Sequence, residues 1–471
     1  MMIAPQPAKY SPALDILDME DLSDEVMAAK FPQTALRFRN DRWAATVGLD
    51  QLSDEEWTRH FGRFEPLEAN LKHPLALRYH GHQFRVYNPD IGDGRGFLFA
   101  QMRDGHGRLM DLGTKGSGQT PYSRFGDGRL TLKGAVREIL ATEMLEALGV
   151  NTSKTFSVIE TGEQLDRNDE PSPTRSAVLV RLSHSHIRIG SFQRAAALQD
   201  DALLHRLVDY ALTRLYDVTP DENPAAQLLN LVVERTADLA ASYMIAGFVH
   251  GVLNSDNINI TGESFDYGPW RFTPYWDPGF TAAYFDHQGL YAFGRQAEAI
   301  HWDVAQLALS LRTLSETEPL VDALNRFPEL YAEAMRRRFC ARLGILQPED
   351  NGKAAELLES AVRAMVESET MIDRFFFDWR GGQLRTIEAQ QRYSSAEWDR
   401  FRELAVSCKP MAVLDHDYWA QPDPCSMHID EVESLWAAID KHDDWAPLYR
   451  KIDAVRQMGE ACATPFQSPE K

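Results

Sequence analysis

The chain has 471 residues, too many for one hydrophobic core, so two or three domains or lobes are expected. Its formal net charge of −21 disfavours nucleic acid and anionic membranes as partners, because both require a basic surface. The four cysteines are widely spaced and form no C-x-x-C pair, which predicts neither a disulfide framework nor a zinc site and fits a reducing cytoplasm. The N-terminus lacks the pattern of a signal peptide, and no apolar run is long enough to cross a bilayer.

The chain divides into four parts. Residues 1–75 read as an irregular N-terminal extension with short helices, including a capping box from Ser53 to Glu56. Residues 76–195 predict a small α+β lobe. Its elements, in chain order, are a Gly-rich turn at 90–96, a strand at 97–102, a hairpin turn at 104–107, a return strand at 109–112, a helix from Thr131 to Gly149, and strands at 156–159 and 177–182 joined by a polar loop at 163–175.

Residues 196–325 are expected to form a second lobe. Apolar stripes at 204–215 and 228–240 predict two helices, the second running toward His250, and a further helix is expected at 297–313. Between them lies a loop, a short strand at 258–260, and a second acidic turn. Residues 326–471 predict an acidic helical C-terminal region.

The first lobe carries a set of residues that suit a phosphate-bearing ligand. The turn containing Gly92, Gly94 and Arg95 could be an ordinary hairpin loop, but Gly-rich turns also let backbone N–H groups approach a phosphate. Lys115 follows a buried-looking strand, and Glu138 lies on the following helix. They could be a solvated strand end and a surface carboxylate, yet a strand Lys paired with a helix Glu is how kinase-type lobes hold nucleotide phosphates.

Two arginines add to this set. Arg181 falls inside the apolar run 178–182, where an unpaired guanidinium is costly, so a functional role is expected. With Arg188 it could clamp an anion such as a terminal phosphate. Asp127-Gly128 most simply makes a turn.

The central stretch resembles a kinase catalytic loop with one essential difference. In H-R-D-x-x-x-x-N followed by D-F-G, His250 occupies the first place, Asn257 the last, and Asp266-Tyr267-Gly268 stands for D-F-G. The position of the usual catalytic Asp is Val252, which cannot accept a proton. Either the fold is an inactive kinase relative, or Asp256 has become the base, with Asn257 and Asp266 as Mg²⁺ ligands.

Longer matches now identify a family resemblance: the chain is similar to the selenoprotein O family (YdiU/SelO) of kinase-like proteins. The matching stretches cover about residues 76–315 in the family's order. They are YHGHQF (79–84), NPDIGDGRG (88–96), DLGTKGSGQTPYSR (111–124), GDGRLTLKGAVREIL (126–140), SHSHIRIGSF (183–192), HGVLNSDNINI (250–260), FDYGP (265–269), DPGF (277–280) and DHQGLYAFGRQ (286–296).

The resemblance implies a two-lobed, protein-kinase-like α+β fold and transfer of AMP from ATP to Ser, Thr or Tyr hydroxyls of proteins, releasing pyrophosphate, with ATP flipped relative to kinases. The roles carried over position by position are catalytic base for Asp256; ATP binding for Gly92, Gly94, Arg95, Lys115, Asp127, Gly128, Arg181, Arg188 and Asp266; an ion pair between Lys115 and Glu138; and metal binding for Asn257 and Asp266.

One departure concerns redox chemistry. Many members carry a C-terminal Cys-x-x-Cys or Cys-x-x-selenocysteine, whereas Cys462 stands alone here and residues 266–300 contain no Cys, which argues against redox control of the active loop. The leading prediction is a cytoplasmic, monomeric protein adenylyltransferase that uses ATP with Mg²⁺ or Mn²⁺. The alternatives are an unorthodox protein kinase and an inactive, ATP-binding pseudokinase scaffold.

Overall fold

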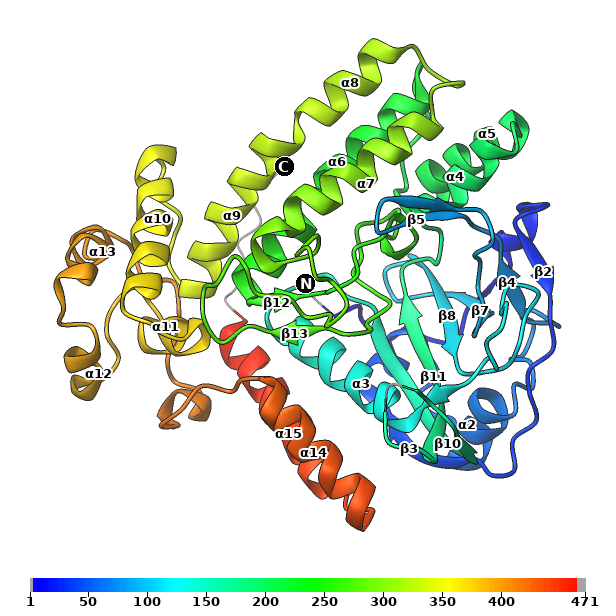
Figure 1. Cartoon of the computed structure of the whole chain (residues 1–471), viewed down its shortest axis with the longest axis horizontal. Coiled ribbons are helices and arrows are strands. Elements are labelled where there is room, and N and C mark those ends of the chain that lie inside the picture. Colours follow the sequence, from blue (N-terminus) through cyan, green and yellow to red (C-terminus); the bar gives the residue numbers. More distant parts are fainter. Residues whose placement is uncertain (1–2, 169, 464–471) are drawn as a thin grey trace.

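The computed structural model describes residues 3–168 and 170–463, and it places a sheet-rich lobe beside a helical lobe (Figure 1). A mixed α+β architecture with one large sheet and a separate helical lobe confirms the expected fold class. The Gly-rich turn, the strand Lys and the helix Glu lie in the first lobe, and the candidate catalytic loop lies in the second. This is the two-lobed arrangement that the sequence predicted.

The sheet of the first lobe is antiparallel throughout and draws strands from both sides of residue 75. Its strand order is β2 (Ser23–Glu25), β4 (Leu75–Leu77), β7 (Leu98–Arg103), β8 (Leu109–Lys115), β11 (Thr174–Ser183), β10 (Lys154–Leu165) and β3 (Ala35–Arg39), with β1 (Pro12–Ala13) on β7 and β9 (Leu130–Thr131) on β11. The N-terminal extension is therefore part of this lobe's sheet.

Side chains alternate between the two faces of the sheet, as the pleat requires. Leu179 of β11 packs in the same core as the helix α3 (Leu132–Ala147). Its neighbour Val180 packs instead with Trp57 of α2 (Asp54–Gly62), on the face that α1 (Asp41–Thr46) also covers. Because Arg181 continues the alternation, it lies on the α3 face, and this is where the candidate site forms.

Local signals for the helices are confirmed. The Thr131 hydroxyl caps α3 by accepting the Gly134 N–H at 3.1 Å, and Gly149 follows the helix at φ +77°. The capping box of α2 is present, with Ser53 and Glu56 bonding each other's backbone.

The second lobe is built on one long buried helix, α6 (Pro224–Ala246), which ends at Gly247 in the left-handed conformation. Around it lie α4 (Ile189–Ala197), α5 (Asp201–Tyr210) with a π turn at Ala211–Leu215, α7 (Gln296–Ser310), α8 (Thr317–Asn325) and α9 (Phe327–Leu343). A two-stranded ribbon of β12 (Phe248–Val249) and β13 (Arg271–Phe272) leads into and out of the candidate catalytic segment.

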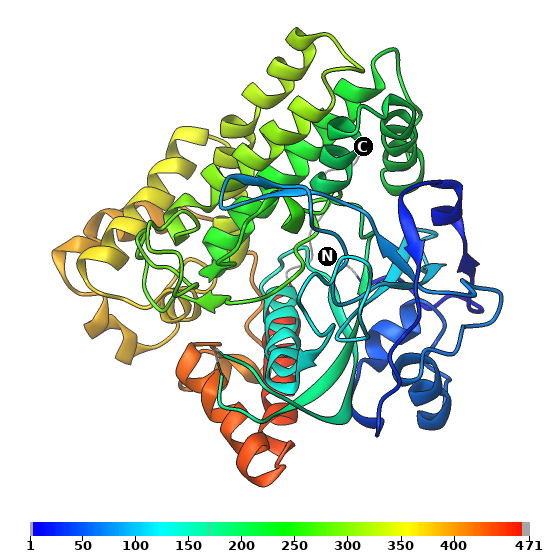
Figure 2. The ribbon, with the colours of Figure 1, turned by 45° about the vertical axis from the view of Figure 1, so that its right-hand side comes forward.

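The C-terminal region is helical but does not form one unit. A separate core gathers α10 (Asn351–Glu367), α11 (Ile372–Asp378), α12 (Ile387–Arg392) and α13 (Asp399–Ala405). The last two helices, α14 (Ile429–His442) and α15 (Ala446–Cys462), return to the first lobe and lie along α3 (Figures 1 and 2). Arg456 of α15 forms an ion pair of 2.7 Å with the buried Glu143 of α3.

Two local expectations were wrong. The stretch 258–260 forms no strand, only an isolated bridge between Asn259 and Arg188, because the Asn259 side chain turns the backbone by accepting the Thr261 N–H. The polar loop expected at 163–175 is shorter, since β10 and β11 extend past a bulge near Gly162 to Leu165 and Thr174. None of the helices in the described ranges combines the length and apolarity that a bilayer span requires.

Candidate active site

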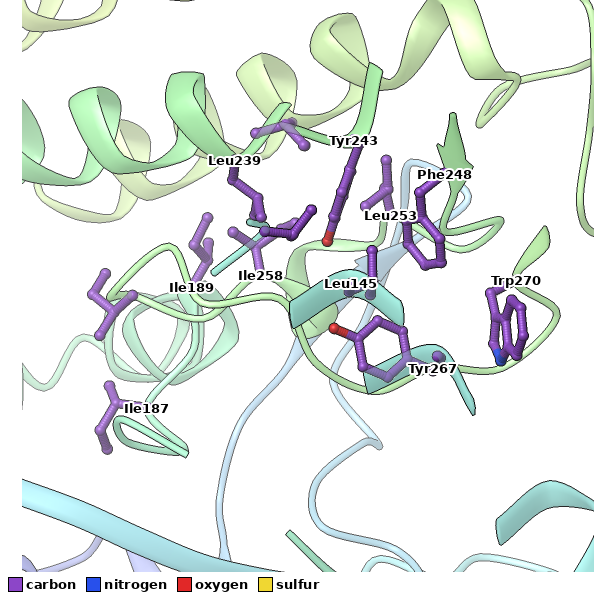
Figure 3. Close-up of a cluster of buried hydrophobic side chains, with 14 of the residues drawn as sticks. Leu145, Ile187, Ile189, Leu239, Tyr243, Phe248, Leu253, Ile258, Tyr267 and Trp270 are labelled. Atoms are coloured by element: carbon purple, nitrogen blue, oxygen red, sulfur yellow. The ribbon is translucent and has the colours of Figure 1, made fainter. Parts of the chain in front are cut away.

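The candidate catalytic segment rests on a buried apolar cluster. Figure 3 shows Leu253 and Ile258, which flank the loop, packed with Tyr243 of α6, Phe248 of β12 and Tyr267 of the D-Y-G turn. Within the segment, Ser255–Asn257 forms a 3₁₀ turn. The His250 ring, fully buried, hydrogen-bonds the Phe265 carbonyl at 3.0 Å and so ties the two acidic turns together. The loop is thus held on a rigid support.

The predicted ion pair between strand and helix is present. Lys115, the last residue of β8, lies 2.6 Å from Glu138 of α3, and both side chains are buried. The Lys115 ammonium also lies 3.3 Å from the Asp266 carboxylate. Lys115 therefore joins the sheet, the helix α3 and the D-Y-G turn.

Asp266 is the centre of the charged cluster. Its two oxygens meet three cations, Lys115, Arg181 at 2.5 Å and Arg188 at 3.1 Å. Burial alone would raise the Asp266 pKa, but these cations lower it well below its usual range, so the group stays ionised. Its backbone is left-handed, at φ +62°.

Arg188 connects the cluster to the other functional segments. It is 1% exposed and donates to the Asp256 backbone carbonyl at 2.9 Å, while a second N–H faces Asp93 of the Gly-rich turn at 3.3 Å. Its guanidinium also stacks over the rings of Tyr79 and Phe265. Burial would lower the Arg188 pKa, but Tyr79, Asp93 and Asp266 raise it, so the charge is retained in a buried site.

Asp256 is suited to accept a proton. It is 8% exposed, and its Oδ1 is buried without a hydrogen-bond partner among the described residues. Burial raises the Asp256 pKa to about 6, against a lowering influence from Arg188. A carboxyl with a pKa just below neutrality is mostly ionised at pH 7 and remains a usable base.

Asn257 and Asp266 offer the oxygen ligands that Mg²⁺ prefers. The Asn257 amide nitrogen donates to the Val252 carbonyl at 3.0 Å, which orients the side chain. In the described part of the chain no three His, Cys, Asp or Glu side chains are grouped to hold a metal ion. Mg²⁺ is commonly bound through one or two carboxylates together with substrate phosphates, so this donor set fits a metal that arrives with the nucleotide.

The Gly-rich turn is braced by the loop that follows Lys115. A Cβ added to Gly92 would lie 2.5 Å from the Tyr122 ring, and one on Gly94 would lie 2.8 Å from the Tyr122 carbonyl, so the turn fits only without side chains there. The Asp93 carboxylate accepts the Leu77 N–H at 3.1 Å. The Arg95 side chain is exposed, and its backbone carbonyl accepts the N–H of Gly116, which follows Lys115, at 2.7 Å.

Asp127 and Gly128 stand apart from the ion pairs of the cluster. Asp127 is about half exposed and pairs with Arg167 at 2.8 Å, while the Gly128 carbonyl accepts the Gly118 N–H from the loop after Lys115. The geometry brings together Lys115, Glu138, Arg181, Arg188, Asp256 and Asp266, and leaves Asp127 outside these contacts.

Several residues of the site carried no separate signal in the sequence. Asp93 lies within the Gly-rich motif without a signal of its own, although it pairs with Arg188 at 3.3 Å. Tyr79 and Phe265 supply the aromatic faces on the arginines. An aromatic residue directly before the Asp of D-Y-G was the available clue for Phe265; nothing local distinguished Tyr79.

Comparison with known proteins shows which family the chain belongs to. The family model described as protein adenylyltransferase SelO matches residues 6–456. The protein nucleotidyltransferase YdiU of Synechococcus elongatus is 40% identical over 480 residues, covering 96% of each chain, and that of Gloeobacter violaceus is 42% identical over 463 residues, covering 95% of each. Among solved structures, a Toxoplasma gondii rhoptry antigen kinase domain aligns over 64% of this chain and 86% of its own, with 12% identity and a TM-score of 0.27.

A buried Lys–Glu pair and two buried arginines beside an unpartnered carboxylate oxygen suit a nucleotide-dependent transferase. The chain belongs to the SelO family of protein adenylyltransferases. It is accordingly a nucleotidyltransferase with ATP as its substrate, and family membership favours AMP transfer to protein over both the unorthodox kinase and the inactive scaffold.

Proposed function

We propose that the protein transfers AMP from ATP to a Ser, Thr or Tyr hydroxyl of a protein substrate, with Asp256 as the general base. The hydroxyl gives its proton to the Asp256 carboxylate as its oxygen attacks the α-phosphorus. The bond between the α-phosphorus and the bridging oxygen to the β-phosphate breaks, and pyrophosphate leaves with that oxygen and its electron pair. The observation that carries this proposal is the unpartnered Asp256 Oδ1, buried beside a cluster of three cations.

The cations are proposed to hold the phosphates. Lys115, kept in place by Glu138, and Arg181 and Arg188 present fixed positive charge where β- and γ-phosphate charge must be stabilised. With ATP in the flipped orientation the α-phosphate faces Asp256 and the leaving pyrophosphate faces the arginines.

The remaining predicted residues would complete the nucleotide site. The N–H groups around Gly92 and Gly94, together with Arg95, would approach the phosphates from the turn, and Asp127 and Gly128 would line the rim.

Asn257 and Asp266 would hold Mg²⁺ or Mn²⁺, which supplies further neutralisation of phosphate charge. Because Asp266 already faces three cations, a free metal ion would meet repulsion at this position. Metal and triphosphate are therefore proposed to bind together. The chain would act as a monomer on protein substrates, and its net charge of −21 disfavours nucleic acid as the acceptor.

The experiment compares ATP labelled at the α-phosphate with ATP labelled at the γ-phosphate. The expected result is α-label on protein, dependent on added Mg²⁺ or Mn²⁺ and abolished in Asp256→Ala. Transfer of γ-label alone would establish a kinase instead. Binding of ATP without transfer of either label would leave the chain a scaffold.

A further inference from the structure

The hairpin of β5 (Gly81–Gln83) and β6 (Val86–Asn88) follows β4 in sequence but leaves the sheet of the first lobe. Within the described residues it is a separate two-stranded sheet, and it lies against the catalytic loop and the helical lobe (Figure 2). It leads directly into the Gly-rich turn at 90–96. It therefore connects the nucleotide turn with the catalytic loop.

The outer edge of β5 is closed by side chains of the catalytic loop. The His82 N–H donates to the Ser255 hydroxyl at 2.7 Å, and the Phe84 N–H donates to the Asn254 side-chain oxygen at 3.1 Å. His82 lies in β5, whereas Phe84, at φ +50°, begins the turn that follows it. The two bonds therefore hold both the strand and its turn on the catalytic loop. The two acceptors are the residues that immediately precede Asp256.

Ser255 belongs to a closed circuit of hydrogen bonds. Its hydroxyl donates to the Gln193 side-chain oxygen at 2.6 Å, and the Gln193 amide nitrogen meets the His82 ring nitrogen Nδ1 at 2.7 Å. Ser255 is fully buried and Gln193 of α4 is 5% exposed. Hydrogen bonds in such surroundings are strong and costly to leave half made.

Asn254 joins the catalytic loop to the segment beyond the D-Y-G turn. The oxygen that accepts the Phe84 N–H also accepts the Tyr291 hydroxyl at 2.6 Å. Asn254 is 4% exposed and Tyr291 is 3% exposed. The hairpin, the catalytic loop and the segment carrying Tyr291 thus meet at one buried atom.

The Asp256 carboxylate itself is held differently. Its Oδ1 has no hydrogen-bond partner in the described structure, so no bond at that atom sets its direction. Arg188 fixes the backbone carbonyl of the same residue. Gly81 leaves the room for the side chain, because a Cβ there would lie 2.9 Å from Asp256 Oδ1. The carboxylate also has a side-chain hydrogen bond with Gln83 of the hairpin. The orientation of the base therefore comes from this contact together with the backbone that precedes Asp256.

We propose that Asn254 and Ser255 are positioning residues for the transfer reaction. Together with His82, Gln193 and Tyr291 they form a loop clamp that aims the Asp256 carboxylate at the acceptor hydroxyl. This proposal rests on the assignment of Asp256 as the base. Because none of the five makes an ion pair of the phosphate-binding cluster, the loop clamp acts on the rate of transfer and not on ATP affinity.

The test measures α-label transfer to protein in a cell extract, using the full chain. The rate at saturating ATP, the dissociation constant for ATP and the melting temperature are recorded for Ser255→Ala, Tyr291→Phe, Gln193→Leu and Gln193→Glu. Loss of one clamp bond is expected to lower the saturated rate about tenfold, with ATP affinity within about twofold of wild type. Gln193→Glu is expected to keep most of the activity, because its carboxylate still accepts from Ser255 and can accept from the His82 ring.

Tyr393→Phe is the matched control, since it removes a hydroxyl that donates to Asp378 and to the Arg374 carbonyl from a fully buried tyrosine in the separate C-terminal core. Clamp variants with wild-type rates would overturn the proposal. The proposal would also be overturned if the rates fall only together with the melting temperature and the ATP affinity, and if Gln193→Glu is as impaired as Gln193→Leu. If Asp256→Ala itself keeps transferring α-label, the assignment of the base fails and the loop clamp fails with it. If Asp256→Ala is inactive and the clamp variants are not impaired, the loop clamp alone is refuted.

Discussion

Replacing Asp266 by Asn tests the charged cluster most directly. The change keeps the shape of the side chain and suits the left-handed backbone at φ +62°, so the main perturbation is the loss of one buried negative charge. Removing one partner of a buried ion pair costs about 3–5 kcal/mol when the other charge is left alone. Here two of the three cations keep another carboxylate: Lys115 has Glu138 at 2.6 Å, and Arg188 has Asp93 at 3.3 Å.

The cost therefore falls mainly on Arg181, whose remaining carboxylate partner is Glu138 at 3.9 Å. We expect Asp266→Asn to lower the free energy of unfolding by about 2–3 kcal/mol, below the full cost of an unpaired buried charge. Because the three cations lose their common partner, ATP added with a metal chelator should raise the melting temperature more in the variant than in wild type. AMP transfer should be abolished, since the variant lacks the proposed carboxylate ligand for the metal.

The assay is thermal unfolding by calorimetry, with and without ATP and chelator. Asp443→Asn is a close control, because Asp443 also faces two arginines and has φ +50°, but its side chain is about half exposed. A surface ion pair contributes about 0–1 kcal/mol, so this control should stay near wild type. An Asp266→Asn protein as stable as wild type, or one that chelated ATP does not stabilise, would refute the account of the cluster.

Three further changes test other parts of the molecule. Burial raises the Glu263 pKa to about 7, so its contribution to stability is present below about pH 4.5 and is lost as pH rises to 7. The unfolding free energy of Glu263→Gln, measured by denaturant titration, should therefore exceed that of wild type at pH 8 but not at pH 4.5. Gly81→Ala would place a methyl group 2.9 Å from the Asp256 carboxylate and should lower the rate of AMP transfer at least about tenfold while ATP still binds; an unchanged rate would show that the hairpin does not press on the base. Arg456→Ala leaves the buried Glu143 of α3 with a weaker partner and should cost about 1–3 kcal/mol in unfolding free energy. Lys133→Ala is its control: it removes a more exposed ion pair between α3 and α14 and should cost less than about 1 kcal/mol.

Much of the site could be read from the sequence because its signals are local. Thr131 and Gly149 mark the ends of α3 through their own backbone preferences, and this sets Glu138 on the helix facing β8. Val252 in place of a catalytic Asp is likewise visible within one loop, and it directs attention to Asp256. An arginine at 181 inside an apolar strand indicates that a buried partner exists, but not which residue it is.

The partners themselves were decided by the tertiary structure. Arg188 meets Asp93, and Ser255 meets the hairpin at His82, across separations that no periodicity or spacing rule encodes. The same is true of α15, which crosses from the C-terminus to lie on α3. Helix caps and turns depend on the conformational preferences of neighbouring residues, whereas ion pairs and buried hydrogen bonds depend on which distant segments the packing of the core brings together.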